Sequence, residues 1–411
     1  MSVTSMNDSI ASTGPEDQAL PKLARLQAPD APADWSWVGP ESLASLNTAV
    51  PLAEANQVPT LLTRPGVEVW GVYVAGRLQA MYICSDHAQH HVTRIAYASA
   101  PQAPGLWLLQ HTFMQLTETL LSAGAQKLSV HLFAGAIRRI WPLFRLNKRF
   151  FLEGRLRQEW QPALQRNEDV FIVSAVDGEG MRPESGTLWL NSHARSSGQR
   201  FFSSWANSQT SALLPETNSR GSTLVDTAEY QLRTLAAKDV NETLVRLLNS
   251  PQLVGSMNLP RFAFSVPSAR ALLASFDRNF NQFIGIFKRT NSELIGFYTV
   301  LVNEPARQAH LALGIHSGEV AASRVMVDTI TPLTDSYFER FPIQKITGNV
   351  LVTNRRMLLS LTHNYTFLLE AVLRQECLGD QGRLDVVVFS TFRDLALRPK
   401  LGRFAPVRGT E

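Results

Sequence analysis

The stretch LEGRLRQE at residues 152–159 has a near-copy later in the chain, LEAVLRQE at residues 369–376. Six of the eight positions agree, at an offset of 217 residues. Three shorter matches occur in the same order, at offsets of 218, 217 and 216: Gln126-Lys127 with Gln344-Lys345, Arg138-Arg139 with Arg355-Arg356, and 169–174 with 385–390. Collinear self-similarity is typical of duplicated units. We therefore expect two copies of one fold, with a chance coincidence of common dipeptides as the alternative.

The second copy shows a regular order of strand and helix patterns. Its expected strands cover 230–234, 283–287, 294–302, 308–315, 345–352, 367–373 and 384–390, and its expected helices cover 239–249, 319–339 and 354–363. Pro332 lies inside the longest helical pattern and predicts a kink or a restart there.

The first copy repeats this order, with strands expected at 72–74, 78–83, 93–97 and 127–133, helices at 106–122 and 137–146, and two closing strands. The pattern predicts an α/β fold with a mixed (α+β) sheet around one central helix, present twice. The expected organisation is a disordered leader at 1–34, a first unit at 35–190, a Ser/Asn-rich connection at 191–227 and a second unit at 228–411.

Composition excludes several classes of protein. The 411 residues are 45% hydrophobic, which is too much for a disordered chain, and only Cys84 and Cys377 are cysteines, which excludes a disulfide scaffold. The N-terminus lacks the apolar segment of a secretory signal, and no apolar stretch reaches the length of a membrane span. A net charge of +4 is weak evidence for a polyanionic partner. We expect a cytoplasmic protein that binds neither DNA nor membrane.

Short motifs in both copies resemble those of the GNAT acyltransferase superfamily, and especially its branch that acetylates the N-termini of ribosomal proteins. The segments that carry the resemblance in the second copy are 232–235 with Asp239, 293–297, 354–356, 367–374 and 385–390. Of the family's strand signature GF-x-x-EG-x-x-R, Thr366 and Ala371 replace the two glycines here, whereas Gly154 keeps the second one in the first copy. The resemblance covers about 228–395 well and about 60–176 more weakly.

The resemblance implies an acyl-CoA donor whose pyrophosphate lies on free N–H groups at the start of the central helix, beside small residues. In the second copy this loop would use Gly318, Ala321, Ala322 and Ser323, although Ile315 stands where the family has Gln or Arg. In the first copy Gln102 and Gly105 fit the pattern, but Trp107 replaces its last small residue. A glycine turn that merely starts a helix is the alternative interpretation.

The resemblance also implies an acid that protonates the leaving sulfur. Ser360, His363 and Tyr365 lie in the corresponding region of the second copy, and Asn354 would hydrogen-bond the pantetheine arm of the donor. None of the three stands at the family spacing, so packing roles stay open. The matching segment of the first copy, 137–150, has no Tyr, Ser or His. We therefore expect the second copy to be active and the first to be degenerate.

Three other features have ordinary explanations. The run of Asp and His at 86–91 is expected to be a solvated turn rather than a metal site, and we expect no metal. His310 and His316 flank the strand before the central helix of the second copy, where one could act as a base, but a packed or surface role is more common. Seven basic residues between 138 and 157 could contact CoA phosphates, a carrier protein or RNA, although a solvated face is the default.

These features together favour an N-acyltransferase that moves an acyl group, most simply acetyl from acetyl-CoA, to a primary amine of a small molecule or a protein. A carrier-protein or aminoacyl-tRNA donor is the alternative within the enzyme class, and it gives the basic run a role. A non-catalytic scaffold built on two such units is the alternative from another class.

Overall fold

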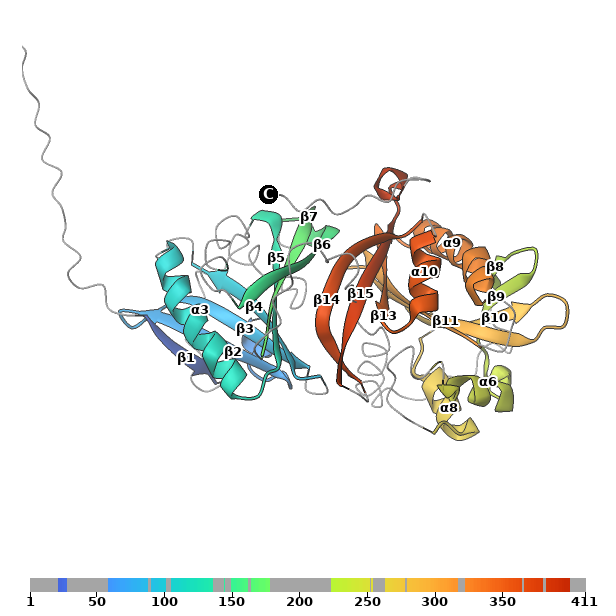
Figure 1. Ribbon diagram of the computed structural model, residues 1–411, viewed down its shortest axis with the longest axis horizontal. Helices are drawn as coiled ribbons and strands as arrows, with labels where there is room; N and C mark the ends of the chain where they lie inside the picture. Colours follow the sequence, from blue (N-terminus) through green and yellow to red (C-terminus); the bar gives the residue numbers. More distant parts are fainter. Residues whose placement is uncertain are drawn as a thin grey trace, which may run out of the picture.

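The computed structural model describes residues 21–27, 58–87, 90–100, 105–135, 144, 149–161, 164–177, 223–251, 253, 263–277, 279–316, 322–363, 366–379 and 382–399. Across these residues, one sheet of 15 strands runs through the molecule in the order β1-β2-β3-β4-β5-β7-β6-β14-β15-β13-β12-β11-β10-β9-β8 (Figure 1). The mixed α/β class predicted from the sequence is confirmed. We call strands β1–β7 with their helices the N-terminal half, and strands β8–β15 with theirs the C-terminal half.

The N-terminal half contains seven strands among its described residues: β1 (Lys22–Leu26), β2 (Val67–Val74), β3 (Arg77–His87), β4 (Val92–Ser99), β5 (Lys127–Phe133), β6 (Phe150–Gln161) and β7 (Arg166–Val176). Its helices are the short α2 (Val58–Leu61) and the long α3 (Gly105–Ser122). Phe113, Leu116 and Leu120 recur at helical spacing on α3 and are buried in the apolar core of this half.

The C-terminal half contains β8 (Thr223–Asp226), β9 (Tyr230–Thr234), β10 (Asn281–Lys288), β11 (Leu294–Asn303), β12 (Gln308–Ile315), β13 (Lys345–Leu351), β14 (Leu368–Gly379) and β15 (Gly382–Phe392). Its helices are α6 (Glu242–Leu248), α8 (Val266–Ala274), α9 (Ala322–Arg340) and α10 (Arg355–His363). Helices α9 and α10 pack against each other, and α6 packs against α8 (Figure 1).

The two halves follow the same order of strand pairing. In the N-terminal half, β2, β3 and β4 are antiparallel, β4 and β5 are parallel, and β5, β7 and β6 are antiparallel. In the C-terminal half, β10, β11 and β12 are antiparallel, β12 and β13 are parallel, and β13, β15 and β14 are antiparallel. A buried tyrosine bonds the central helix in each half, Tyr82 to Thr112 of α3 at 2.9 Å and Tyr298 to Thr329 of α9 at 2.7 Å.

The halves meet where β6 pairs antiparallel with β14, and we call this contact the junction. Its register places Gly154 opposite Ala371. These two residues occupy the same position of the repeated octet, so equivalent points of the two halves face each other. A Cβ on Gly154 would lie 2.3 Å from the Cβ of Ala371 and 2.8 Å from the carbonyl oxygen of Glu370. The missing side chain at Gly154 therefore allows the strands to approach.

Several expectations differ in detail from the structure. Residues 22–26 fall within the expected leader and form β1, which pairs with β2. Residues 223–226 fall within the expected connection and form β8, which pairs with β9. The expected restart at Pro332 is wrong, because α9 continues through it from Ala322 to Arg340. Most of the expected helix at 137–146 lies outside the described residues.

Candidate functional site

The parallel pair β12 and β13 separates along its length. Pairing runs from Gln308 opposite Lys345 to Leu311 opposite Gly348 and stops there. Both strands continue, β12 to Ile315 and β13 to Leu351. Backbone donors and acceptors along these ends therefore lack ladder partners across the gap, and a polar chain could pair with them.

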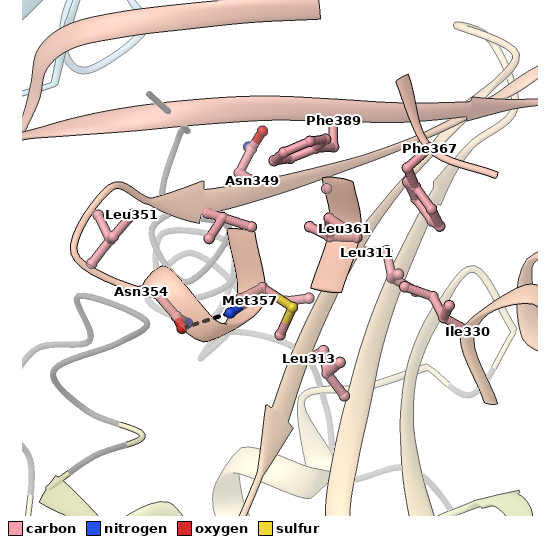
Figure 2. Close-up of a pocket in the computed structure, with 13 residues that line it drawn as sticks. Leu311, Leu313, Ile330, Asn349, Leu351, Asn354, Met357, Leu361, Phe367 and Phe389 are labelled. Carbon is pink, nitrogen blue, oxygen red and sulfur yellow. Dashed lines mark hydrogen bonds between the residues drawn. The ribbon is translucent and has the colours of Figure 1, made fainter. Parts of the chain in front are cut away.

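A cavity of about 50 Å³ lies where the two strands separate. Its lining residues are Leu311, Ala312, Leu313, Ile330, Gly348, Asn349, Val350, Leu351, Asn354, Met357, Leu361, Phe367 and Phe389. Figure 2 shows Met357 and Leu361 of α10 beside Leu311 and Leu313 of β12, with Phe367 and Phe389 at the far side. A water needs roughly 10–15 Å³ of such space, so the cavity suits a small group rather than a long acyl chain.

The start of helix α10 lies beside this cavity, because Asn354 and Met357 line it. Asn354 precedes the helix, and its side-chain oxygen accepts a hydrogen bond of 3.2 Å from the backbone N–H of Met357 (Figure 2). Asparagine is among the best residues for capping a helix N-terminus in this way. The cap aligns Asn354, Met357 and Leu361 on the face that lines the cavity.

Asn349 supplies a polar group to an otherwise largely apolar lining. Its Nδ2 lies 3.4 Å from Nε2 of His310 on the neighbouring strand β12. Its Oδ1 is buried and has no hydrogen-bond partner among the described residues. A buried acceptor without a partner costs about 1–3 kcal/mol, so a bound N–H group would recover stability at this position.

Of the three expected catalytic residues, Ser360 is the one whose side chain the structure describes. Ser360 is buried on α10, and its hydroxyl donates a hydrogen bond of 2.9 Å to the carbonyl oxygen of Arg356. His363 ends α10, but its side chain is outside the described part, as is Tyr365 altogether. The acid assigned to this group stays a prediction.

The expected donor loops lie mostly outside the described residues. Gly318, Ala321 and Gln102 belong to segments that are not described. Ala322 and Ser323 begin α9, and Gly105 begins α3, so the small residues do stand at helix starts. Of the predicted donor contacts that the structure describes, Asn354 lines the cavity.

Sequence reasoning missed the walls of the cavity. Leu311, Ile330 and Phe389 lie in the strands expected at 308–315 and 384–390 and in the helix expected at 319–339, and all three are buried. Gly348 was the available signal, because an isolated glycine inside a strand often marks a place where pairing changes. It occupies the last position at which β13 pairs with β12.

Two clusters of buried charge flank the junction. Lys127 of β5 binds Glu153 at 2.9 Å and, across the junction, Glu376 at 3.0 Å. Lys345 of β13 binds Glu370 at 2.6 Å and, across the junction, Glu159 at 2.5 Å. Burial alone would lower the pKa of Lys345, but the Glu159 and Glu370 carboxylates outweigh it and hold the pKa above its ordinary value. Lys345 is therefore a charged residue that links the two halves by ion pairs, at the first position of strand β13, whose later residues line the cavity.

Among the described residues, no three His, Cys, Asp or Glu side chains gather as they would around a metal ion. In the same part of the chain, no helix combines the length and apolarity that crossing a membrane requires.

The chain has no match among protein-family models, and no curated protein matches its sequence. Its structure is similar to solved GNAT acetyltransferases, as the sequence motifs predicted. One is the acetyltransferase from Salmonella typhimurium that modifies the N-terminal serine of ribosomal protein L7/L12, at 17% identity and a TM-score of 0.38. It matches 42% of this chain and 100% of its own.

Two further structural neighbours are also acetyltransferases of low sequence identity to this chain. The ribosomal-protein-S5-alanine acetyltransferase from Vibrio fischeri is 14% identical with a TM-score of 0.36, over 41% of this chain and 96% of its own. A microcin C7 self-immunity acetyltransferase in complex with acetyl-CoA and AMP is 16% identical with a TM-score of 0.37, over 44% of this chain and 98% of its own. Each neighbour thus has less than half the length of this chain.

Proposed function

We propose that this protein is an N-acyltransferase, and that its C-terminal half binds an acyl-CoA and passes the acyl group to a primary amine. The observation that supports this most is the separation of β12 from β13 around a small, largely apolar cavity. The free strand edges suit the amides of a pantetheine arm, and the cavity suits a short acyl group such as acetyl. Asn354 lines the cavity, which suits the predicted contact with that arm.

Acyl transfer from a thioester to an amine requires few catalytic side chains. The amine nitrogen attacks the thioester carbonyl, a C–N bond forms, the C–S bond breaks, and the thiolate takes up the proton that the amine loses. Asn349 is placed to accept a hydrogen bond from an N–H group, because its buried Oδ1 lacks a partner among the described residues. Ser360, His363 or Tyr365 would supply the proton to sulfur, as the family resemblance implies.

We further propose that the chain arose by internal duplication. The collinear matches at offsets near 217 support this, as do the identical pairing orders of the two halves. The acceptor amine would belong to a small molecule or a protein.

Isothermal titration of the full chain with acetyl-CoA and longer acyl-CoAs tests the proposal. We expect saturable binding of acetyl-CoA that weakens with acyl length, since the cavity is small. Gly318→Trp should abolish binding by filling the expected pyrophosphate loop, and the matched variant Gly105→Trp in the other half should not. Absence of binding to any acyl-CoA at millimolar concentration would refute this donor and favour a carrier-bound donor or a scaffold role.

A further inference from the structure

The N-terminal half has the same strand separation as the C-terminal half. Strands β4 and β5 pair from Val92 opposite Lys127 to Ile95 opposite Val130, and both then continue, to Ser99 and Phe133. The backbone frame of a donor site is therefore present twice. What differs is the set of side chains beside the gap.

Three positions around the gap can be matched between the halves. The Tyr–Thr hydrogen bonds make Thr112 equivalent to Thr329, so the next residue on each helix, Phe113 or Ile330, is also equivalent. The repeated octet makes Phe150 equivalent to Phe367, and the same offset of 217 matches Phe144 with Leu361.

In the C-terminal half, the three side chains line the open cavity. Ile330 comes from α9, Leu361 from α10 and Phe367 from the residue before β14. Figure 2 shows Leu361, Ile330 and Phe367 arranged around it.

In the N-terminal half, the matching residues are three phenylalanines in mutual contact. The ring centroids of Phe113 and Phe144 are 5.7 Å apart, those of Phe144 and Phe150 are 5.3 Å apart, and those of Phe113 and Phe150 are also 5.3 Å apart. All three rings are buried, with at most 8% of their surface exposed. Such distances are typical of well-packed aromatic clusters.

We propose that Phe113 and Phe144 fill the acyl cavity of the N-terminal half, so that the chain has one donor site rather than two. Two rings replace the branched aliphatic side chains whose smaller size leaves the cavity of about 50 Å³ in the C-terminal half. The N-terminal half keeps the strand frame and the junction contacts, but its described side chains leave no room for the acyl group between these rings. This inference rests on the proposed acyl-CoA function only for the identity of the ligand.

Titration of the full chain with acetyl-CoA tests the number and place of the sites. We expect one molecule bound per chain. Leu361→Phe copies the N-terminal ring into the C-terminal cavity and should weaken binding at least tenfold. The matched variant Phe144→Leu should leave affinity and stoichiometry unchanged. Two molecules bound per chain, or binding lost in Phe144→Leu and kept in Leu361→Phe, would overturn the inference.

Thermal unfolding of the same chain tests the packing without any ligand. Leu361→Phe should keep or raise Tm because it fills a cavity. Phe144→Ala should lower Tm by about 5 °C or more because it opens a packed cluster. An unchanged Tm in Phe144→Ala would show that the ring fills nothing and would overturn the inference. If acetyl-CoA does not bind, the proposed function fails while these two variants still decide whether the N-terminal cavity is filled.

Discussion

At the residue scale, the two repeated octets differ at their third position, and these two residues lie in contact at the junction. Gly154 and Ala371 are the third residues of the two copies, and they face each other across β6 and β14. The strands could not keep this spacing with a side chain at both positions, because the added Cβ would meet backbone atoms as well as the Ala371 methyl group. The junction therefore accommodates the methyl group of Ala371 because the residue opposite it is Gly154.

Gly154→Ala should push strands β6 and β14 apart and weaken the junction. The new Cβ would lie 2.5 Å from the Cα of Ala371, so the strands must move apart and their buried contacts weaken. We expect a loss of about 2–4 kcal/mol in the free energy of unfolding, measured by urea titration. Gly135→Ala is the control, because its Cβ would meet only Glu168 Oε2 at 3.7 Å. Equal stability of the two variants would contradict the close approach.

Asp239 offers a test of electrostatics at one residue. Burial would raise its pKa, but the bidentate contact with Arg233 at 2.7 Å and the bond from the Ala236 N–H outweigh it and hold the pKa below its ordinary value. A carboxyl whose pKa is depressed in the folded state adds stability above its unfolded pKa and loses it as pH falls through the folded pKa.

Asp239→Asn should therefore destabilise the protein at pH 7 by about 1–3 kcal/mol, since it removes hydrogen bonds to a charged group. The difference from the unmodified protein should shrink as pH falls below about 3.9, the usual pKa of an unfolded aspartate. Urea unfolding at pH 7 and pH 3 measures both values. Asp226→Asn is the control, because its contact with Arg289 is solvent-exposed and contributes well under about 1 kcal/mol. A difference that is the same at both pH values would refute the assignment.

At the element scale, helix α9 shows that packing can override a local sequence signal. Pro332 has no N–H, so it leaves the carbonyl oxygen one turn earlier without its helical partner. The helix continues because Ile330 and Leu333 on either side are buried in the core. The burial of this apolar face offsets the local cost and holds the chain in helical form.

Pro332→Ala should raise the stability of α9. It restores one helical hydrogen bond and removes the ring clash, a gain of up to about 3 kcal/mol. The measurement is Tm by circular dichroism. Pro267→Ala is the control, because this proline lies in the first turn of α8, where no helical N–H partner is lost, and no gain is expected. A lower Tm in Pro332→Ala would show that the fold requires the proline.

At the scale of the whole molecule, the two halves exchange charged partners across the junction. Lys127 forms an ion pair with Glu376 of the other half at 3.0 Å and donates a hydrogen bond of 2.7 Å to the carbonyl oxygen of Arg374. Lys345 donates hydrogen bonds to the Glu159 carboxylate at 2.5 Å and to the carbonyl oxygen of Arg157 at 3.0 Å. Breaking a buried ion pair costs more than the pair itself contributes, because a charge is left without a partner. The clusters therefore couple the two halves and tie β6 to β13.

Lys345→Met should destabilise the protein by about 3–5 kcal/mol, because Glu159 and Glu370 then remain buried without a cation. The triple variant Lys345→Met, Glu159→Gln, Glu370→Gln should recover much of this loss. Guanidinium unfolding followed by fluorescence measures both variants. A triple variant less stable than Lys345→Met would refute unpaired charge as the cause.

The order of strands and helices, and its repetition, could be read from residues close together in sequence. Periodicity predicted the central helix over 319–339, close to the observed Ala322–Arg340, and the strands on both sides of it, because burial on one face imposes a spacing on local residues. The repeated octet likewise marked β6 and β14 as equivalent strands.

The joining of the two halves into one sheet, and the opening of a cavity in the C-terminal half, depend on contacts between residues far apart in the chain. Gly154 lies opposite Ala371, and Lys345 forms an ion pair with Glu159. The two members of each pair are far apart in the sequence, and no local pattern encodes such a pairing. The cavity likewise follows from the volumes of Ile330 and Leu361, which come from separate helices and matter only once both pack beside the separated strands.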